Sequence, residues 1–146
     1  MPLSKRLIVG ALTIALLDAA PARAQATAYV VIVNAANPVS TLSRAQTAEY
    51  FFKKKGSWDG GQPVVPVDQN DAAPVRKAFS THVLGREVYS VKSYWQGLIF
   101  SGRAVPPIEK SSDADVIAFV AGNTGAIGYV SPSATLGNTV KVVKIE

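Results

Sequence analysis

The sequence predicts an α/β domain of about four strands with flanking helices. Residues 29–33 form an unbroken apolar, β-branched run that is typical of a strand covered on both faces, and residues 126–130 form a second apolar run. Between them, helix-starting residues followed by apolar residues three or four positions apart recur in four segments. Because the 146 residues show no internal repeat or linker, we expect a single domain.

The N-terminal segment has the layout of a secretory signal peptide. Two basic residues precede an apolar stretch, residues 7–17, and Ala22-Arg23-Ala24 supplies the small-x-small pattern of a cleavage site. The stretch is shorter than the about 20 apolar residues of a spanning helix, and an uncleaved N-terminal anchor is the alternative. We therefore expect a signal peptide over residues 1–24, a domain over residues 25–146, and a periplasmic or secreted protein with no stable membrane span after cleavage.

The charge and the composition exclude several classes of function. The chain carries a net charge of +5, of which residues 1–24 supply +2, so the expected mature domain carries only +3. A weak positive charge spread over many positions does not indicate a nucleic-acid-binding protein. The lysines at 53–55 are explained as the basic end of a helix. The absence of cysteine excludes disulfides, thiolate catalysis and Cys-ligated metals.

The first half of the domain is expected to alternate strand and helix. The strand over residues 29–33 is followed by an Asn-Pro turn at residues 37–38. Ser43 and Gln46 have the spacing of a capping box, which predicts a helix from there to about Lys54.

A second strand and helix follow. Residues 64–67 read as a short strand, and Pro66, which lacks a donor N–H, favours an edge or a strand end. Asp71 is expected to cap a helix that has Pro74 in its first turn and ends at Leu84.

Two more helices and a terminal strand complete the prediction. Ser90 is expected to cap a third helix that runs to about Phe100 and buries an aromatic-rich face. The residues expected on that face are Val91, Tyr94, Trp95, Leu98 and Ile99. Ser112 or Asp113 is expected to cap the fourth helix. Residues 140–145 alternate apolar residues with lysine, which predicts a half-exposed strand.

Three motifs, in this order and at these spacings, resemble one known family. They are the Asn-Pro turn at 37–38, the Phe-Lys-Lys-Lys-Gly element at 52–56 with Trp58 after it, and Gly-Ala-Ile-Gly-Tyr-Val at 125–130. Together they resemble one lobe of the phosphate-type substrate-binding proteins of ABC importers, which have a type 2 periplasmic-binding-protein-like fold. The resemblance runs from about residue 29 to residue 130 and implies a single-lobe member of that fold.

The resemblance also implies a ligand and partners. In the family two α/β lobes close on an oxyanion, which is held by hydroxyls and by backbone N–H groups at helix N-termini. The part that matches is the second lobe, and no residues are left for the first. The partners implied are phosphate or another oxyanion, and an ABC permease or a second copy in a homodimer. No cofactor is implied.

The segment that grips the anion departs from the family pattern. Classical members carry an Arg and then a Ser-Gly-Thr turn at the start of the second helix. Here Asp68 or Gln69 stands in place of the Arg, and Ala73-Pro74-Val75 replaces the hydroxyl turn. Asp68 and Asp71 would oppose an anion by several kcal/mol at about 5 Å. We therefore expect weak or altered anion binding.

Six residues are the candidate ligand contacts: Asn34, Asn37, Asn70, Ala73, Arg76 and Ser101. The two earliest follow the first strand at its C-terminal end, where open α/β sheets place ligands, although turn formation also explains them. Arg76 could reach back to an anion, or could be an exposed arginine paired with Asp71 or Glu87. Ser101 could offer a hydroxyl or could simply end a helix.

An enzyme is not expected. His82 is the single histidine, and Asp113 and Asp115 are explained as helix-start charges. No nucleophile–base set, metal cluster or cofactor motif accompanies them. Trp58 and the aromatic residues of the third helix are explained as core rather than as a stacking platform. The leading hypothesis is an exported, non-enzymatic solute-binding-like protein. The alternative is an exported interaction or scaffold module that kept the fold but not transport.

Overall fold

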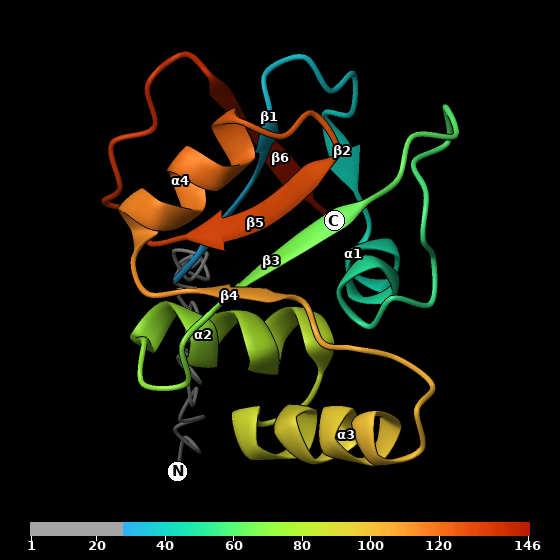
Figure 1. The fold of residues 1–146 in the computed structure, drawn as a ribbon. Coiled ribbons are helices and arrows are strands. Elements are labelled where there is room, and N and C mark those ends of the chain that lie inside the picture. Colours follow the sequence, from blue (N-terminus) through green and yellow to red (C-terminus); the bar gives the residue numbers. More distant parts are fainter. Residues whose placement is uncertain (1–27) are drawn as a thin grey trace, which may run out of the picture.

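Within residues 28–146, which the computed structural model describes, six strands form one mixed sheet with helices on both faces (Figure 1). The predicted signal peptide lies outside these residues. The strands are β1 (Val30–Asn34), β2 (Thr41–Leu42), β3 (Val65–Gln69), β4 (Ile108–Lys110), β5 (Ala126–Val130) and β6 (Val140–Ile145). The helices are α1 (Arg44–Phe51), α2 (Pro74–Phe79), which continues as a π-helix over Ser80–Leu84, α3 (Val88–Phe100) and α4 (Asp113–Ala121).

The strand order is β2-β6-β1-β5-β3-β4. β3 runs parallel to β5 and β4, whereas β1 runs antiparallel to β5 and β6. The C-terminal ends of β1 and β3 therefore lie at opposite ends of the sheet. The sequence predicts four of these strands. The expected number is corrected to six because β2 and β4 have only two and three residues, too few to show a periodic pattern.

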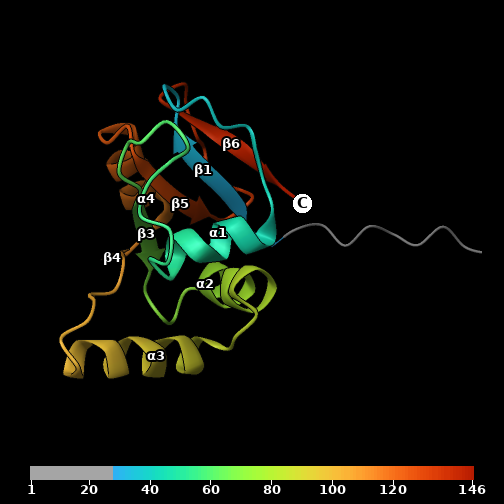
Figure 2. The same cartoon turned by 90° about the vertical axis from the view of Figure 1, so that its right-hand side faces the viewer.

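Successive residues of β1 enter two separate cores, one on each face of the sheet. Val31 and Val33 pack with residues of α1 and α2, whereas Ile32 packs with Val116 and Val120 of α4. This arrangement explains the unbroken apolar run, because both faces of the strand are covered. In Figures 1 and 2 α4 lies on one face, while α1 and α2 lie against the other.

Gly128 marks the closest approach of α4 to the sheet. A Cβ atom at this position in β5 would lie 2.7 Å from Cγ1 of Val116. A side chain here would push the helix away from the strand, so the glycine of the Gly-Ala-Ile-Gly-Tyr-Val motif is needed for packing.

Two of the predicted helix starts are confirmed. The backbone N–H of Gln46 donates to Oγ of Ser43 at 3.1 Å, and the N–H of Ser43 donates to Oε1 of Gln46 at 2.9 Å, which completes the capping box of α1. Ser112 caps α4 with its side chain alone, since its Oγ accepts the N–H of Asp115 at 3.1 Å. The first helix ends at Phe51 rather than near Lys54.

The other two predicted starts are corrected. α2 begins at Pro74 with Ala73 at the N-cap position and no side-chain cap. Asp71 lies two residues before that position and pairs with Lys92 instead. α3 begins at Val88, two residues before the predicted cap. Pro66 lies near the start of β3, as expected for a strand end. It is opposite Ile127 of β5 on one side, and on the other side β4 pairs with β3 only from Val67 onwards.

The outermost helix is α3, which in both views lies farther from the strands than α2 does (Figures 1 and 2). Only Val91 and Trp95 of this helix are buried. Ile99, which was expected on the buried face, is half exposed, because the helix packs on other helices and not on the sheet. None of the helices in residues 28–146 is long and apolar enough to cross a membrane.

Candidate functional site

A buried ion pair joins the end of β3 to the start of α2. Asp68 is 6% exposed and Arg76 is 3% exposed, and the guanidinium contacts the carboxylate directly. Val67 faces α4, so the next residue of the strand faces α2. The expected exposed arginine paired with Asp71 or Glu87 is therefore wrong. The turn after β3 brings the first turn of α2 back over the strand, with Arg76 on its buried stripe.

Two further donors reach the Asp68 carboxylate. The hydroxyl of Tyr129, on β5, donates to Oδ1, and the backbone N–H of Gln69 donates to the same oxygen at 3.0 Å. Burial raises the pKa of Tyr129 to about 12, so its hydroxyl keeps its proton and remains a donor at ordinary pH. Charge and hydrogen bonds together compensate the buried carboxylate.

Gln69 extends this network to the opposite layer. Its Nε2 donates to the carbonyl of Tyr129 at 3.0 Å and to Oδ1 of Asp113 at 2.8 Å. Asp113 also accepts the backbone N–H of Ser131 at 3.1 Å. Burial alone would raise the pKa of Asp113, but these hydrogen bonds hold it below its ordinary value. The network therefore ties β3, β5 and the first turn of α4 together.

A groove of about 380 Å³ opens over the ion pair, and we call it the Arg76 groove. Its lining residues are Asp68, Asp71, Arg76, Lys92, Trp95, Gln96, Ile99, Pro106, Pro107 and Glu109. The side chains of Asp71 and Lys92 contact each other at the rim. With both ion pairs neutral, the carboxylate of Glu109 leaves the groove with one net negative charge.

Three of the predicted ligand residues lie together beside this groove. Asn70 follows β3, its Oδ1 accepts the N–H of Ala72 at 3.1 Å, and its Nδ2 donates to the carbonyl of Ser111 at 3.2 Å. Ala73 precedes α2, and its N–H donates to the carbonyl of Asn70 at 3.1 Å. Both residues shape the turn that places Arg76 over β3.

The other three candidates lie elsewhere. Asn34 is at the opposite end of the sheet, where its Nδ2 donates to the last carbonyls of α4 at 2.9 and 3.0 Å. Ser101 donates to carbonyls of the last turn of α3 at 2.9 and 3.1 Å, so its hydroxyl closes the helix. The C-terminal end of the first strand lies away from the Arg76 groove because β1 is antiparallel to its neighbours.

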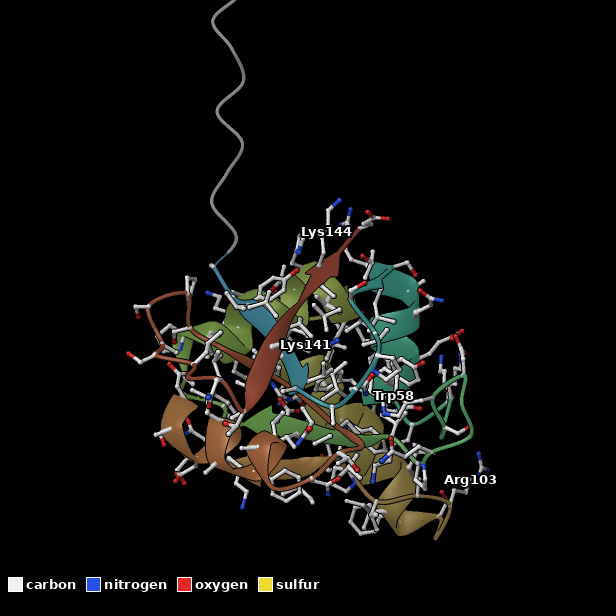
Figure 3. All side chains as sticks on the ribbon, turned by 90° about the horizontal axis from the view of Figure 1, so that it is seen from above. Trp58, Arg103, Lys141 and Lys144 are labelled. Carbon is white, nitrogen blue, oxygen red and sulfur yellow. The ribbon has the colours of Figure 1, made fainter. Side chains whose placement is uncertain are left out.

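Asn37 lines a second pocket, of about 350 Å³, with Trp58 and Tyr50. Its Oδ1 accepts the N–H of Val39 at 2.9 Å, as expected for a turn asparagine, and its Nδ2 has no partner among the described residues. Trp58 is buried, whereas Arg103 and Lys144 lie at the margin of the molecule in the view of Figure 3. Trp58 Nε1 donates to the carbonyl of Gly125 at 3.0 Å, which confirms a core role.

No metal site is formed in residues 28–146, because no three acidic, His or Cys side chains gather. Neither the role of Tyr129 nor the pairing of Asp68 with Arg76 was predicted from the sequence. The alternation of β5 around Gly128 offered a partial signal, since it places Tyr129 on the face opposite α4. No pattern in the sequence indicates that Asp68 and Arg76 form an ion pair.

The described residues have the fold of one lobe of a periplasmic binding protein. A structure described as a phosphate ABC transporter substrate-binding protein with bound phosphate, from Clostridium perfringens, matches 81% of this chain and 44% of its own, with a TM-score of 0.63 and 24% identity. An ABC-type phosphate transport receptor from Vibrio cholerae matches 81% of this chain and 46% of its own, with a TM-score of 0.63 and 22% identity.

A third solved structure, PstS from Borrelia burgdorferi, covers 82% of this chain and 47% of its own, with a TM-score of 0.56 and 11% identity. The chain thus spans less than half the length of each of these three proteins. No family model and no curated protein sequence matches it. The similarity to these structures confirms the predicted fold class. At 11–24% identity it supports the fold and nothing further.

Replacing Arg76 by Met should destabilise the protein strongly. The change keeps most of the side-chain volume but leaves the Asp68 carboxylate buried without its counter-ion, which costs about 3–5 kcal/mol. Lys92→Met removes the exposed cation of the rim pair and should cost at most about 1 kcal/mol. Urea unfolding measures both variants, and similar losses in the two would show that the buried pair contributes no more than a surface pair.

Stability should fall between pH 10 and pH 12 because of Tyr129. Its pKa is about 12 in the folded protein and 10.0 when unperturbed, so the unfolded state loses its proton first as the pH rises. A two-unit difference in pKa corresponds to about 2.7 kcal/mol, present below pH 10 and lost by pH 12.

The stability advantage of the wild type over Tyr129→Phe should therefore shrink by about 2–3 kcal/mol between pH 9 and pH 12, as measured by urea unfolding. Tyr89→Phe, at a side chain that is 79% exposed, is the matched control and should follow the wild-type curve. A constant difference between wild type and Tyr129→Phe would contradict the burial of this hydroxyl.

Proposed function

We propose that the chain is an exported, non-enzymatic solute-binding-like protein, related to the phosphate and oxyanion substrate-binding subunits of ABC importers, with weak or altered anion binding. The fold supports the relationship. The predicted signal peptide supports a periplasmic or secreted location. The solved structures with this fold are named as phosphate-binding or phosphate-transport proteins, which supports an oxyanion as the ancestral kind of ligand.

The observation that carries the weak-binding proposal is the pairing of Arg76 with Asp68. Arg76 is the one buried cation among residues 28–146, and its charge is already compensated by a carboxylate. At the start of α2, Ala73 offers no hydroxyl and Pro74 offers no N–H. The surplus carboxylate of Glu109 adds repulsion. A small free oxyanion would therefore meet few donors and no uncompensated buried cation in this groove.

Isothermal titration of the secreted protein with phosphate and with sulfate tests this proposal. We expect dissociation constants of about 1 mM or weaker, because the groove offers an anion only surface-type interactions. Lys92→Met, which removes the rim cation, should change this affinity by no more than a few-fold. A submicromolar dissociation constant for either anion would overturn the proposal.

The alternative function is an exported interaction or scaffold module, and a separate observation favours it. Four large apolar side chains are exposed around the end of α3 and the edge strand β4: Ile99, Phe100, Val105 and Ile108. Phe100 is 91% exposed, which is unusual for a side chain of this size. Such a surface suits a protein partner better than it suits a solute.

Two experiments distinguish the two functions. One tests whether purified ABC permease retains the protein, and the other measures by sedimentation whether the protein alone self-associates. A solute-binding subunit should be retained by a permease, whereas a scaffold should instead self-associate or bind another protein. If the apolar surface serves either contact, Phe100→Ser should weaken that contact at least about ten-fold, the loss expected when an aromatic anchor is removed. Tyr89→Ser, at the other end of α3, is the control and should leave it unchanged.

A further inference from the structure

The carboxylate of Asp68 is held in the way that a protein holds a small free anion. It has one cationic partner, one hydroxyl donor and one backbone N–H donor, in a site that is almost closed to solvent. Charge-assisted hydrogen bonds of this kind are the ones that bind carboxylates and other oxyanions. Here the anion is a side chain of the protein itself.

The fold, and not Asp68, positions the other members of this donor set. The ring of Tyr129 stacks on Phe79 with centroids 3.9 Å apart and planes at 8°, and Phe51 packs beside both. Arg76 lies in the first turn of α2, and its Nη1 reaches the carbonyl of Gln69 at 3.4 Å. The donors come from three different elements, so they should keep their places when the carboxylate is removed.

The Arg76 groove gives a route to this donor set from outside. Both Asp68 and Arg76 contribute to its lining, so the ion pair forms part of its wall and is not sealed within the core. Arg76 also keeps a buried Nε with no partner among the described residues. A small anion that enters the groove would reach the guanidinium if the Asp68 carboxylate were absent.

We propose that Asp68 is a built-in anion that closes a carboxylate-binding site formed by Arg76, Tyr129 and the N–H of Gln69. Asp68 is then the residue that determines the specificity of the groove, because it excludes free anions by occupying their donors. The space that it fills matches one carboxylate group, so the free ligand of the opened site is a monocarboxylate of the size of formate or acetate. The larger phosphate fits it less well.

This proposal deepens the proposed function, since it names the cause of the weak anion binding, and it can fail separately. Phosphate and sulfate titration of the wild type tests the proposed function alone. The test of Asp68 uses formate on Asp68→Ala, the variant that removes the carboxylate and leaves room for a ligand. Asp68→Asn removes the charge but fills the space, and Asp68→Ala with Arg76→Met removes the cation as well.

Thermal unfolding of the secreted protein is measured in sodium formate, sodium acetate and sodium phosphate against sodium chloride at equal ionic strength. The Tm of Asp68→Ala should rise by roughly 5 °C at a formate concentration ten times its dissociation constant. Acetate should give a similar rise, and phosphate a smaller one. The wild type, Asp68→Asn and the double variant should each shift by about 1 °C or less.

Asp68→Ala leaves a buried guanidinium without a counter-ion and can lose its fold for that reason. In that case formate should restore the near-ultraviolet circular dichroism of the wild type, while the double variant should be folded in chloride and insensitive to formate. Equal formate effects in Asp68→Ala and in the double variant would overturn the proposal. The absence of any formate effect on either the Tm or the folding of Asp68→Ala would overturn it too.

Discussion

A buried carboxylate that must be compensated is the constraint on which the centre of this protein depends. Removing Asp68 from water carries a desolvation cost of several kcal/mol, which the structure offsets with a guanidinium, a phenol hydroxyl and a backbone N–H. These partners lie on α2, β5 and β3. The ion pair therefore specifies how α2 sits over the sheet, and the hydrophobic core around Phe79 and Tyr129 packs around that arrangement.

The same constraint links the architecture to the proposed loss of anion binding. A site for a free oxyanion needs donors whose charge is not already compensated, and a stable buried arginine needs a permanent partner. One guanidinium cannot meet both needs at once. In this chain Arg76 has a permanent partner, so the start of α2 contributes stability and offers no uncompensated cation to a free anion.

Local sequence patterns predicted much of the fold. They did not predict the direction of a strand within the sheet or the contacts between residues of different elements. The helix caps and the long apolar strands are local features, and Ser43, Gln46 and Ser112 appear as predicted. The direction of β1 in the sheet is not a local feature, so the sequence did not show that Asn34 and Arg76 lie at opposite ends of the sheet. Asp68 and Arg76 are eight positions apart, and only the turn between β3 and α2 decides that they meet. A carboxylate eight residues before an arginine predicts nothing without that turn.

The two proposed functions share one structural element, the helix α3. Trp95, Gln96 and Ile99 form a wall of the Arg76 groove, while Ile99 and Phe100 belong to the exposed apolar surface. Of this helix only Val91 and Trp95 are buried, so few contacts hold it in place. A partner that covers Ile99 and Phe100 would therefore also cover part of the wall of the groove. Solute binding and protein binding at this end of the molecule are thus expected to be coupled, and a protein partner would alter access to Asp68 and Arg76.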